Sequence, residues 1–239
     1  MKKTLISLAA CLLCAVGAFA QDGSWSVNAG TEAMSQFIWR GTEAALHPTI
    51  IPTISLDWEN DDCSFELGQC SITELTGDEY LEMDIWASFS YKGLSFTFTE
   101  FGMGNNLGIG GYEDNAEVSL AYEFPWSVPV SLSWNTFVLG DDFNENGKRA
   151  FSSYAELAVP YEIGDLTLTG IVGAVPFRSD WTYGNETDSF KLTNVTLNAT
   201  YNLSLDNLEL PVYAQFIRNP MTKSNYYVLG CVLNLCFDL

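Results

Sequence analysis

The chain has 239 residues and a formal net charge of −20, because 30 acidic side chains stand against 10 basic ones. Such a charge argues against proteins that bind nucleic acid or dock on anionic lipid headgroups. The length leaves room for one large all-β domain or two small ones.

The N-terminus has the features of a secretory signal peptide. Met1, Lys2 and Lys3 form a basic start, an apolar run follows to Phe19, and Ala18-Phe19-Ala20 reads as a cleavage site. We therefore expect a signal peptide over residues 1–20 and one domain over residues 21–239. The signal carries two lysines and no acid, so the mature chain is more acidic still, near −22. No later run approaches the length that a transmembrane helix needs.

The mature chain alternates between apolar and polar residues, which is the period of a β-strand. The clearest case is Asn194 to Leu203, where Val195, Leu197 and Ala199 face one way and the intervening Asn and Thr residues face the other. No helical period appears. In chain order, the segments that we expect to be strands are 25–39, 50–58, 64–72, 81–91, 94–99, 116–124, 130–138, 155–159, 166–172, 194–203, 210–216 and 226–237.

The links between these segments alternate in length. Tight links such as Lys92-Gly93 alternate with long polar ones such as 102–115, 140–150 and 176–189. Outer-membrane barrels have short periplasmic turns, longer outer loops and an even number of strands. The weakly patterned segment 64–72 is needed to keep this topology, and it brings the total to about 12.

Aromatic residues gather near both kinds of link, as the two aromatic girdles of a membrane barrel would. The set near the short links is Trp58, Tyr91, Tyr122, Trp126, Tyr161, Tyr201 and Phe237. The set near the long loops is Trp39, Tyr80, Phe101, Phe137, Phe151, Phe177 and Tyr226.

Charge also separates the two faces of the strands. The apolar faces of these segments lack charged residues, whereas acids lie on the opposite faces. We therefore expect an all-β fold, namely an antiparallel up-and-down transmembrane β-barrel of about 12 strands. The alternative is a soluble secreted β-sandwich that binds glycans, because antiparallel sheets of soluble proteins alternate in the same way. The residues expected to line the lumen are Glu32, Asp57, Glu82, Asp84, Glu117, Glu123 and Glu156, with Arg40 at the outer mouth as a partner for one of them.

One loop resembles the start of a calcium-binding loop. Asp142, Asn144 and Asn146, followed by Gly147, match D-x-N-x-N-G. Position 12 is Ser153, where such loops carry a bidentate Glu. An acidic β-turn is the alternative, and we otherwise expect no cofactor.

Residues for catalysis are scarce. His47 is the one histidine, and we place it in an outer loop as a solvated side chain. We expect no enzymatic activity. Four cysteines stay in the mature chain. We expect Cys63 and Cys70 on one strand, and Cys231 and Cys236 on another. Residues seven apart on one strand are about 23 Å apart, too far for a disulfide.

A resemblance adds to this reading. Ser35 to Gly41 (SQFIWRG), with Pro48 and a two-faced strand ending at Trp58, looks like the opening of the TorF-type porins. The stretch from Gly140 to Tyr161 is similar to one found in uncharacterised outer-membrane barrels of Gram-negative bacteria. The resemblance implies a barrel with a transport role, delivered to the barrel assembly machinery.

The function expected from the sequence is a narrow, porin-like channel for small solutes with an acidic lumen that favours cations. We expect a monomer in the outer membrane of a Gram-negative bacterium, exported through the Sec pathway and surrounded by outer-membrane lipid. An alternative is a closed barrel whose outer loops, 102–111 and 176–184, bind a ligand or partner.

Overall fold

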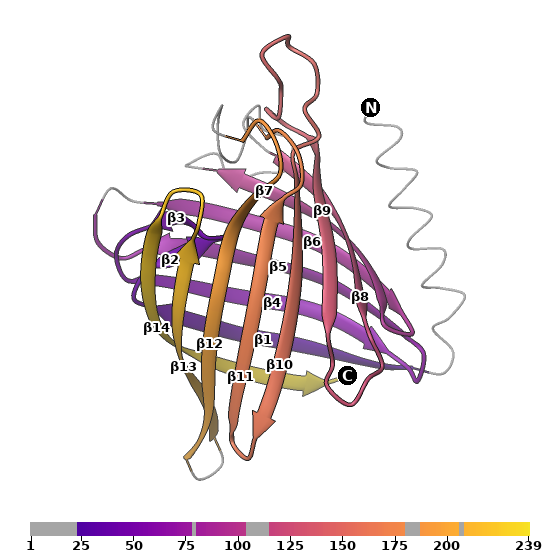
Figure 1. Cartoon of the computed structure of the whole chain (residues 1–239). Coiled ribbons are helices and arrows are strands. Elements are labelled where there is room, and N and C mark those ends of the chain that lie inside the picture. The colour runs from indigo at the N-terminus through magenta and orange to yellow at the C-terminus, as the bar shows by residue number, and fades with distance from the viewer. Residues whose placement is uncertain (1–22, 78–79, 104–114, 180–186, 206–207) are drawn as a thin grey trace.

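The computed structural model of the chain describes residues 23–77, 80–103, 115–179, 187–205 and 208–239. The signal peptide expected over residues 1–20 lies outside these ranges. Antiparallel strands close into a barrel in the order β1-β14-β13-β12-β11-β10-β9-β8-β7-β6-β5-β4 (Figure 1). This confirms the expected all-β class, the up-and-down topology and the number of 12 strands. In the described part of the chain, no helix is long and apolar enough to cross a membrane.

Each barrel strand pairs with its neighbour in the chain, and the first pairs with the last. Contacts from Ser26 with Asp238 to Met34 with Gly230 close the ring. The strands are β1 (Ser24–Met34), β4 (Thr49–Glu59), β5 (Cys63–Glu74), β6 (Leu81–Tyr91), β7 (Leu94–Met103), β8 (Asn115–Glu123), β9 (Ser131–Leu139), β10 (Ser153–Ile163), β11 (Leu166–Val175), β12 (Lys191–Leu205), β13 (Leu208–Asn219) and β14 (Ser224–Asp238).

Strand β5 confirms a strand that the sequence supports weakly. Its residues have few alternating apolar side chains, yet it pairs with β4 and β6 along nearly its whole length. The need for an even number of strands was therefore a better guide than local pattern. Its two cysteines are free, as are Cys231 and Cys236, and each pair lies on a single strand, β5 or β14, as expected.

The first strand is shorter than expected. It ends at Met34 rather than near Trp39, and the chain then forms a separate hairpin from β2 (Phe37–Trp39) and β3 (Thr42–Ala45). Arg40 and Gly41 form its tip with φ values of 52° and 81°. Two successive positive φ values are typical of a type I′ turn, which matches the twist of paired strands. Lys92 and Gly93 (φ 48° and 84°) form the same kind of turn between β6 and β7, as expected.

The outward face of the barrel is apolar. Exposed aliphatic or aromatic side chains occur on every strand from β4 to β14. Leu197, for example, is 56% exposed, although a soluble sandwich would bury it between two sheets. The sandwich alternative is therefore wrong, because one sheet closes on itself. The exposed outward side chains include Ile54, Leu67, Leu94, Leu120, Leu132, Leu157, Val172, Leu197, Phe216 and Leu229.

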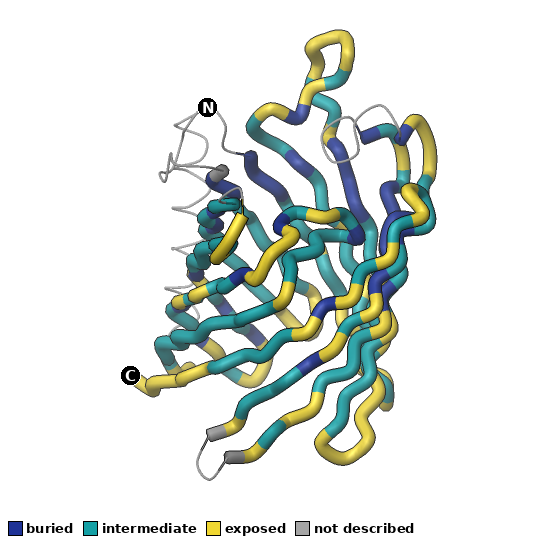
Figure 2. Tube along the Cα trace, turned by 90° about the vertical axis from the view of Figure 1, so that its left-hand side faces the viewer, coloured by how far each residue is buried: buried dark blue, intermediate teal, exposed yellow. Residues whose placement is uncertain are grey.

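Buried residues gather toward the long-loop end of the barrel, drawn at the top in Figures 1 and 2. The short-turn end carries exposed aromatic residues as expected, among them Tyr91, Trp126, Tyr161 and Phe237. A row of cross-strand partners, Trp25, Trp58, Phe65, Phe89 and Phe96, extends this aromatic band over five strands.

Candidate functional site

The β2–β3 hairpin lies inside the barrel, at the long-loop end. Trp39 contacts Phe101 on β7 and Phe137 on β9, with ring centroids 6.3 Å away in both cases. On the opposite side, Asn219 of β13 donates a hydrogen bond of 3.0 Å from Nδ2 to the carbonyl oxygen of Gly41. A short segment that contacts strands on both sides of a closed ring must cross its interior. The hairpin therefore narrows the lumen.

Gly41 fits against the barrel wall more closely than any other residue type could. A Cβ atom at this position would lie 2.1 Å from the carbonyl oxygen of Thr193 on β12. Its φ of 81° is also one that glycine adopts without steric cost. The sequence therefore needs glycine here both for the turn and for the approach to β12.

Arg40, at the hairpin tip, is held by a bidentate ion pair with Glu117 of β8. The two terminal guanidinium nitrogens, Nη1 and Nη2, each lie 2.7 Å from a carboxylate oxygen, and the two side chains are 12% and 4% exposed. The guanidinium carbon also lies 4.3 Å from the ring centroid of Trp39 and 4.7 Å from that of Tyr154. Planar, two-pronged pairing suits arginine better than lysine, and stacking on aromatic rings adds cation–π attraction.

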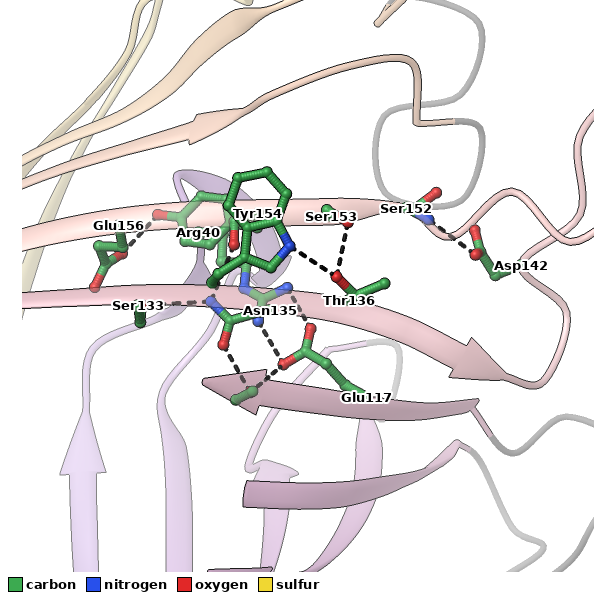
Figure 3. A network of polar contacts seen from close by, with 12 residues as sticks. Arg40, Glu117, Ser133, Asn135, Thr136, Asp142, Ser152, Ser153, Tyr154 and Glu156 are labelled. Carbon is green, nitrogen blue, oxygen red and sulfur yellow. Dashed lines mark hydrogen bonds and ion pairs between the residues drawn. The ribbon is translucent and has the colours of Figure 1, made fainter. Parts of the chain in front are cut away.

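The Arg40 pair belongs to a wider polar network, shown in Figure 3. Tyr154 donates a hydrogen bond of 2.6 Å to Glu156, and Asn194 donates one of 3.1 Å to the Tyr154 hydroxyl. Tyr154 has room because Gly173 on β11 lacks a side chain, where a Cβ atom would lie 1.8 Å from the hydroxyl oxygen. Ser119 connects Glu117 to Asn135. These contacts hold two acids and one cation in a fixed arrangement under the hairpin.

Other acids expected in the lumen lie on the same face of the sheet and have donors of their own. Asp57 accepts from Asn28 (2.6 Å) and Ser55 (2.7 Å). Glu32 accepts from the Tyr213 hydroxyl at 2.5 Å. Trp86 donates to Glu66 at 2.9 Å, which adds an acid that the sequence reading did not select.

Glu82 and Asp84 lie beside the hairpin and are 5% and 8% exposed. Tyr80 donates its hydroxyl hydrogen to Glu82, and its ring lies tilted against that of Phe37 of the hairpin, with centroids 6.4 Å apart. Glu123, by contrast, is an exposed residue at the last position of β8, near the short-turn end. A lumen-lining role of all these acids stays a prediction.

Several aromatic residues expected in the long-loop girdle lie inside the barrel instead. Trp39, Phe101 and Phe137 form one cluster, in which the Phe101 and Phe137 centroids are 5.7 Å apart. Tyr226 packs with Tyr213 and Ile217 in a second interior cluster, together with Ile38 of the hairpin. The alternation of the strands already indicates this: Phe101 has the parity of Thr97 and Thr99, and Phe137 that of Ser133 and Asn135. Of the expected set, Phe151 and Phe177 are exposed.

The 140–152 loop forms a closed turn. The side-chain oxygen of Asn144 accepts from the backbone N–H groups of Asn146 and Lys148, at 3.0 and 3.1 Å. The fully buried Asp142 accepts from the Ser152 backbone at 3.0 Å. These are the bonds of the acidic β-turn, and calcium at Asp142, Asn144 and Asn146 stays a prediction.

His47 lies in the loop before β4, as expected, with Nδ1 2.7 Å from a carboxylate oxygen of Glu74. Loop segments 104–111 and 180–184, expected to carry a binding role in the closed-barrel alternative, lie outside the described residues.

Comparisons with known proteins place the fold but not a family. No family model and no curated protein matches the chain, so the resemblance to TorF-type porins stays an expectation. A membrane protein solved in a study of in-meso crystallisation is 10% identical, with a TM-score of 0.50 over 89% of this chain and 84% of that one. An outer-membrane channel from Pseudomonas putida F1 is 14% identical, with a TM-score of 0.47 over 90% and 95% of the two chains. A porin from Rh. blastica is 10% identical, with a TM-score of 0.35 over 91% and 99%. The match with a TM-score of 0.50, at 10% identity, shows the barrel fold alone.

Proposed function

We propose that this protein is an outer-membrane β-barrel that forms a narrow channel for small solutes, with an acidic lumen that favours cations. The observation that carries the proposal is the difference in polarity between the outward and inward faces of one closed sheet. The outward face exposes apolar side chains on nearly every strand, whereas the inward face holds hydrogen-bonded acids.

The exterior supports a membrane location. A closed barrel leaves no strand edge unpaired, which is what hydrocarbon requires of any β structure that crosses it. Charged residues at outward positions lie near the long loops: Glu100 is three residues from the end of β7, and Arg218 is one from the end of β13. Exposed aromatic residues at the short-turn end would lie at the periplasmic interface. Sec export, the Gram-negative outer membrane and use of the assembly machinery are parts of the same proposal, as is a monomeric barrel.

The interior supports selectivity for cations. Rings of acidic side chains favour cations in channels. Arg40 brings a positive charge into the lumen, but its bidentate pair with Glu117 offsets that charge. The remaining acids are therefore expected to make the electrostatic potential in the lumen negative.

The width of the passage follows from the strand number and the hairpin. Barrels of about 8 strands are filled by side chains, and barrels of about 16 leave an open pore. This barrel lies between them, and the β2–β3 hairpin takes up part of its interior. We therefore propose passage of small ions and solutes rather than of large ones.

Planar bilayer recordings test the proposal. With a potassium chloride gradient across the bilayer, the reversal potential should have the sign of a cation-selective pore. Asp57→Asn should reduce this selectivity, because it removes one inward charge and keeps a hydrogen-bonding side chain of the same shape. A preference for anions would contradict the proposal.

The second candidate function is a closed barrel that binds a ligand through its outer loops. The hairpin favours it, since contacts with strands on both sides of the ring could seal the lumen. No current from a barrel that still shows a heat-dependent shift in gel mobility would favour this function over the channel.

A further inference from the structure

Glu82 and Asp84 are two neighbouring inward acids of one strand, and both are almost fully buried. They lie two residues apart on β6, so they share its inward face. The two residues are only 5% and 8% exposed. Two negative charges are thus brought together away from bulk water.

The surroundings of this pair hold donors for only part of its oxygen atoms. The Tyr80 hydroxyl donates to Glu82, and the Cys70 sulfur lies 3.9 Å from Oδ2 of Asp84. The other carboxylate oxygen of Asp84, Oδ1, is buried and has no hydrogen-bond partner. Asp57 and Glu156, by contrast, accept strong hydrogen bonds from neutral donors.

No basic residue flanks the pair on the adjacent strands. In the register of the barrel, Cys70 and Phe101 lie beside Asp84, and Ile72 lies beside Glu82. Arg40 is held on β8 by Glu117. Two neighbouring buried carboxyl groups need a compensating positive charge, which must be a shared proton or a bound cation.

We propose that Glu82 and Asp84 bind one partly hydrated divalent cation inside the barrel. Mg²⁺ is commonly held by one or two carboxylates while it keeps several waters, and the charge of two carboxylates matches it. The described residues contain no group of three or more His, Cys, Asp or Glu that could hold a metal ion. With two carboxylates as its protein ligands, the ion would take its remaining ligands from water. This inference rests on the proposed channel function and deepens it, because it names a binding site for cations on the permeation path.

The first test measures binding without any current. Purified barrel in detergent, freed of metal with a chelator, is unfolded by heat while its tryptophan fluorescence is followed, with and without magnesium chloride. A ligand that binds the folded state raises the unfolding temperature by mass action. The wild type and Glu66→Gln should show a saturable rise with Mg²⁺. In the double variant Glu82→Gln/Asp84→Asn, the apparent affinity should be weaker by at least about tenfold.

Glu66→Gln is the matched control, because Glu66 is also an inward acid but accepts a hydrogen bond from Trp86. Asp84→Asn alone serves if the double variant does not fold, as judged by its heat-dependent gel mobility. An equal Mg²⁺ response in the wild type and the Glu82/Asp84 variants would overturn the proposal. A wild type that does not respond to Mg²⁺ at any pH would overturn it as well, and would assign the compensating charge to a shared proton.

The second test places the site on the ion path. In planar bilayers, millimolar Mg²⁺ should lower the potassium current through the wild type, and the double variant should lose this block. The two tests fail separately. A barrel that binds Mg²⁺ but passes no current would contradict the channel and leave the cation site standing, whereas a current without Mg²⁺ stabilisation or block would do the reverse.

Discussion

At the scale of single residues, the Arg40–Glu117 pair decides where the hairpin lies. Both side chains are almost fully buried, and removing one partner of a buried pair typically costs about 3–5 kcal/mol because it leaves an uncompensated charge. Arg40→Met should therefore release the hairpin from the barrel wall, since release lets water reach Glu117 at a smaller cost than unfolding. We expect faster hydrogen exchange of the backbone amides of residues 37–45, with the barrel strands unchanged.

The control for this prediction is Arg178→Met. Arg178 pairs with Glu145 at 3.2 Å, but the two side chains are 38% and 64% exposed. Exposed pairs contribute about 0–1 kcal/mol, so this variant should leave hairpin exchange unchanged. Equal exchange in the two variants would mean that Arg40 does not hold the hairpin. The swap Arg40→Glu/Glu117→Arg should restore part of the protection.

The sequence predicts which acids point into the barrel, but it does not predict which side chains they contact. Alternation predicts that Glu117 and Glu156 lie on the inward face. The sequence also predicts that Arg40 pairs with one of the inward acids at the outer mouth. It could not show that Tyr154 lies between Arg40 and Glu156, because Arg40 and Tyr154 are over 100 positions apart and meet only through the closure of the sheet. Side-chain pairing across non-neighbouring strands depends on curvature and tilt, which the period of two does not encode.

At the scale of elements, the hairpin is the part of the fold that narrows the lumen. Gly41→Val should displace it, because a Cβ atom would lie 2.1 Å from the Thr193 carbonyl oxygen, and both neighbours of Thr193 are paired with β11. We expect a larger single-channel conductance in planar bilayers, since a displaced hairpin leaves more open cross-section.

Gly147→Val separates this clash from backbone strain. Gly147 also has a positive φ (69°), but nothing lies within 4 Å of a Cβ atom there. Both substitutions therefore carry the cost of a side chain at positive φ, and only Gly41→Val adds a collision. If the two variants conduct alike, the hairpin does not set the conductance.

The sequence predicted the barrel strands well and missed the hairpin, for a physical reason. Lys92-Gly93 was recognised as a turn because a long alternating strand, Leu94 to Thr99, follows it at once. Arg40-Gly41 forms the same turn, but Thr42–Ala45 is four residues long and does not alternate. A hairpin this short is stable only through its contacts with the barrel interior, so its own residues carry little of the information that specifies it.

At the scale of the whole molecule, the aromatic residues correct one of the two girdles that the sequence predicts. At the short-turn end, Tyr91, Trp126, Tyr161 and Phe237 are exposed, as in an interfacial girdle, whereas Trp58 and Phe65 of the same band are buried. At the other end, Trp39, Phe101 and Phe137 pack with one another inside the barrel. Aromatic pairs contribute about 0.5–1.5 kcal/mol beyond burial, so these rings stabilise the hairpin rather than anchor the barrel in lipid.

The membrane orientation of the whole sheet predicts opposite effects for adjacent residues of β12. Leu197 is 56% exposed on the outward face, and its neighbour Asn198 lies on the inward face, where its amide donates to Thr200. Arginine on the lipid face of a barrel near the bilayer midplane costs about 2–4 kcal/mol, whereas lumen positions tolerate charge. Leu197→Arg should therefore lower the free energy of unfolding from lipid vesicles in urea by about that amount, and Asn198→Arg should lower it far less while shifting the reversal potential toward anions. In a detergent-free aqueous buffer neither variant should remain soluble. If Asn198→Arg destabilised the barrel more than Leu197→Arg, the assignment of the inward and outward faces would be wrong. The proposal of an acidic lumen would then fail.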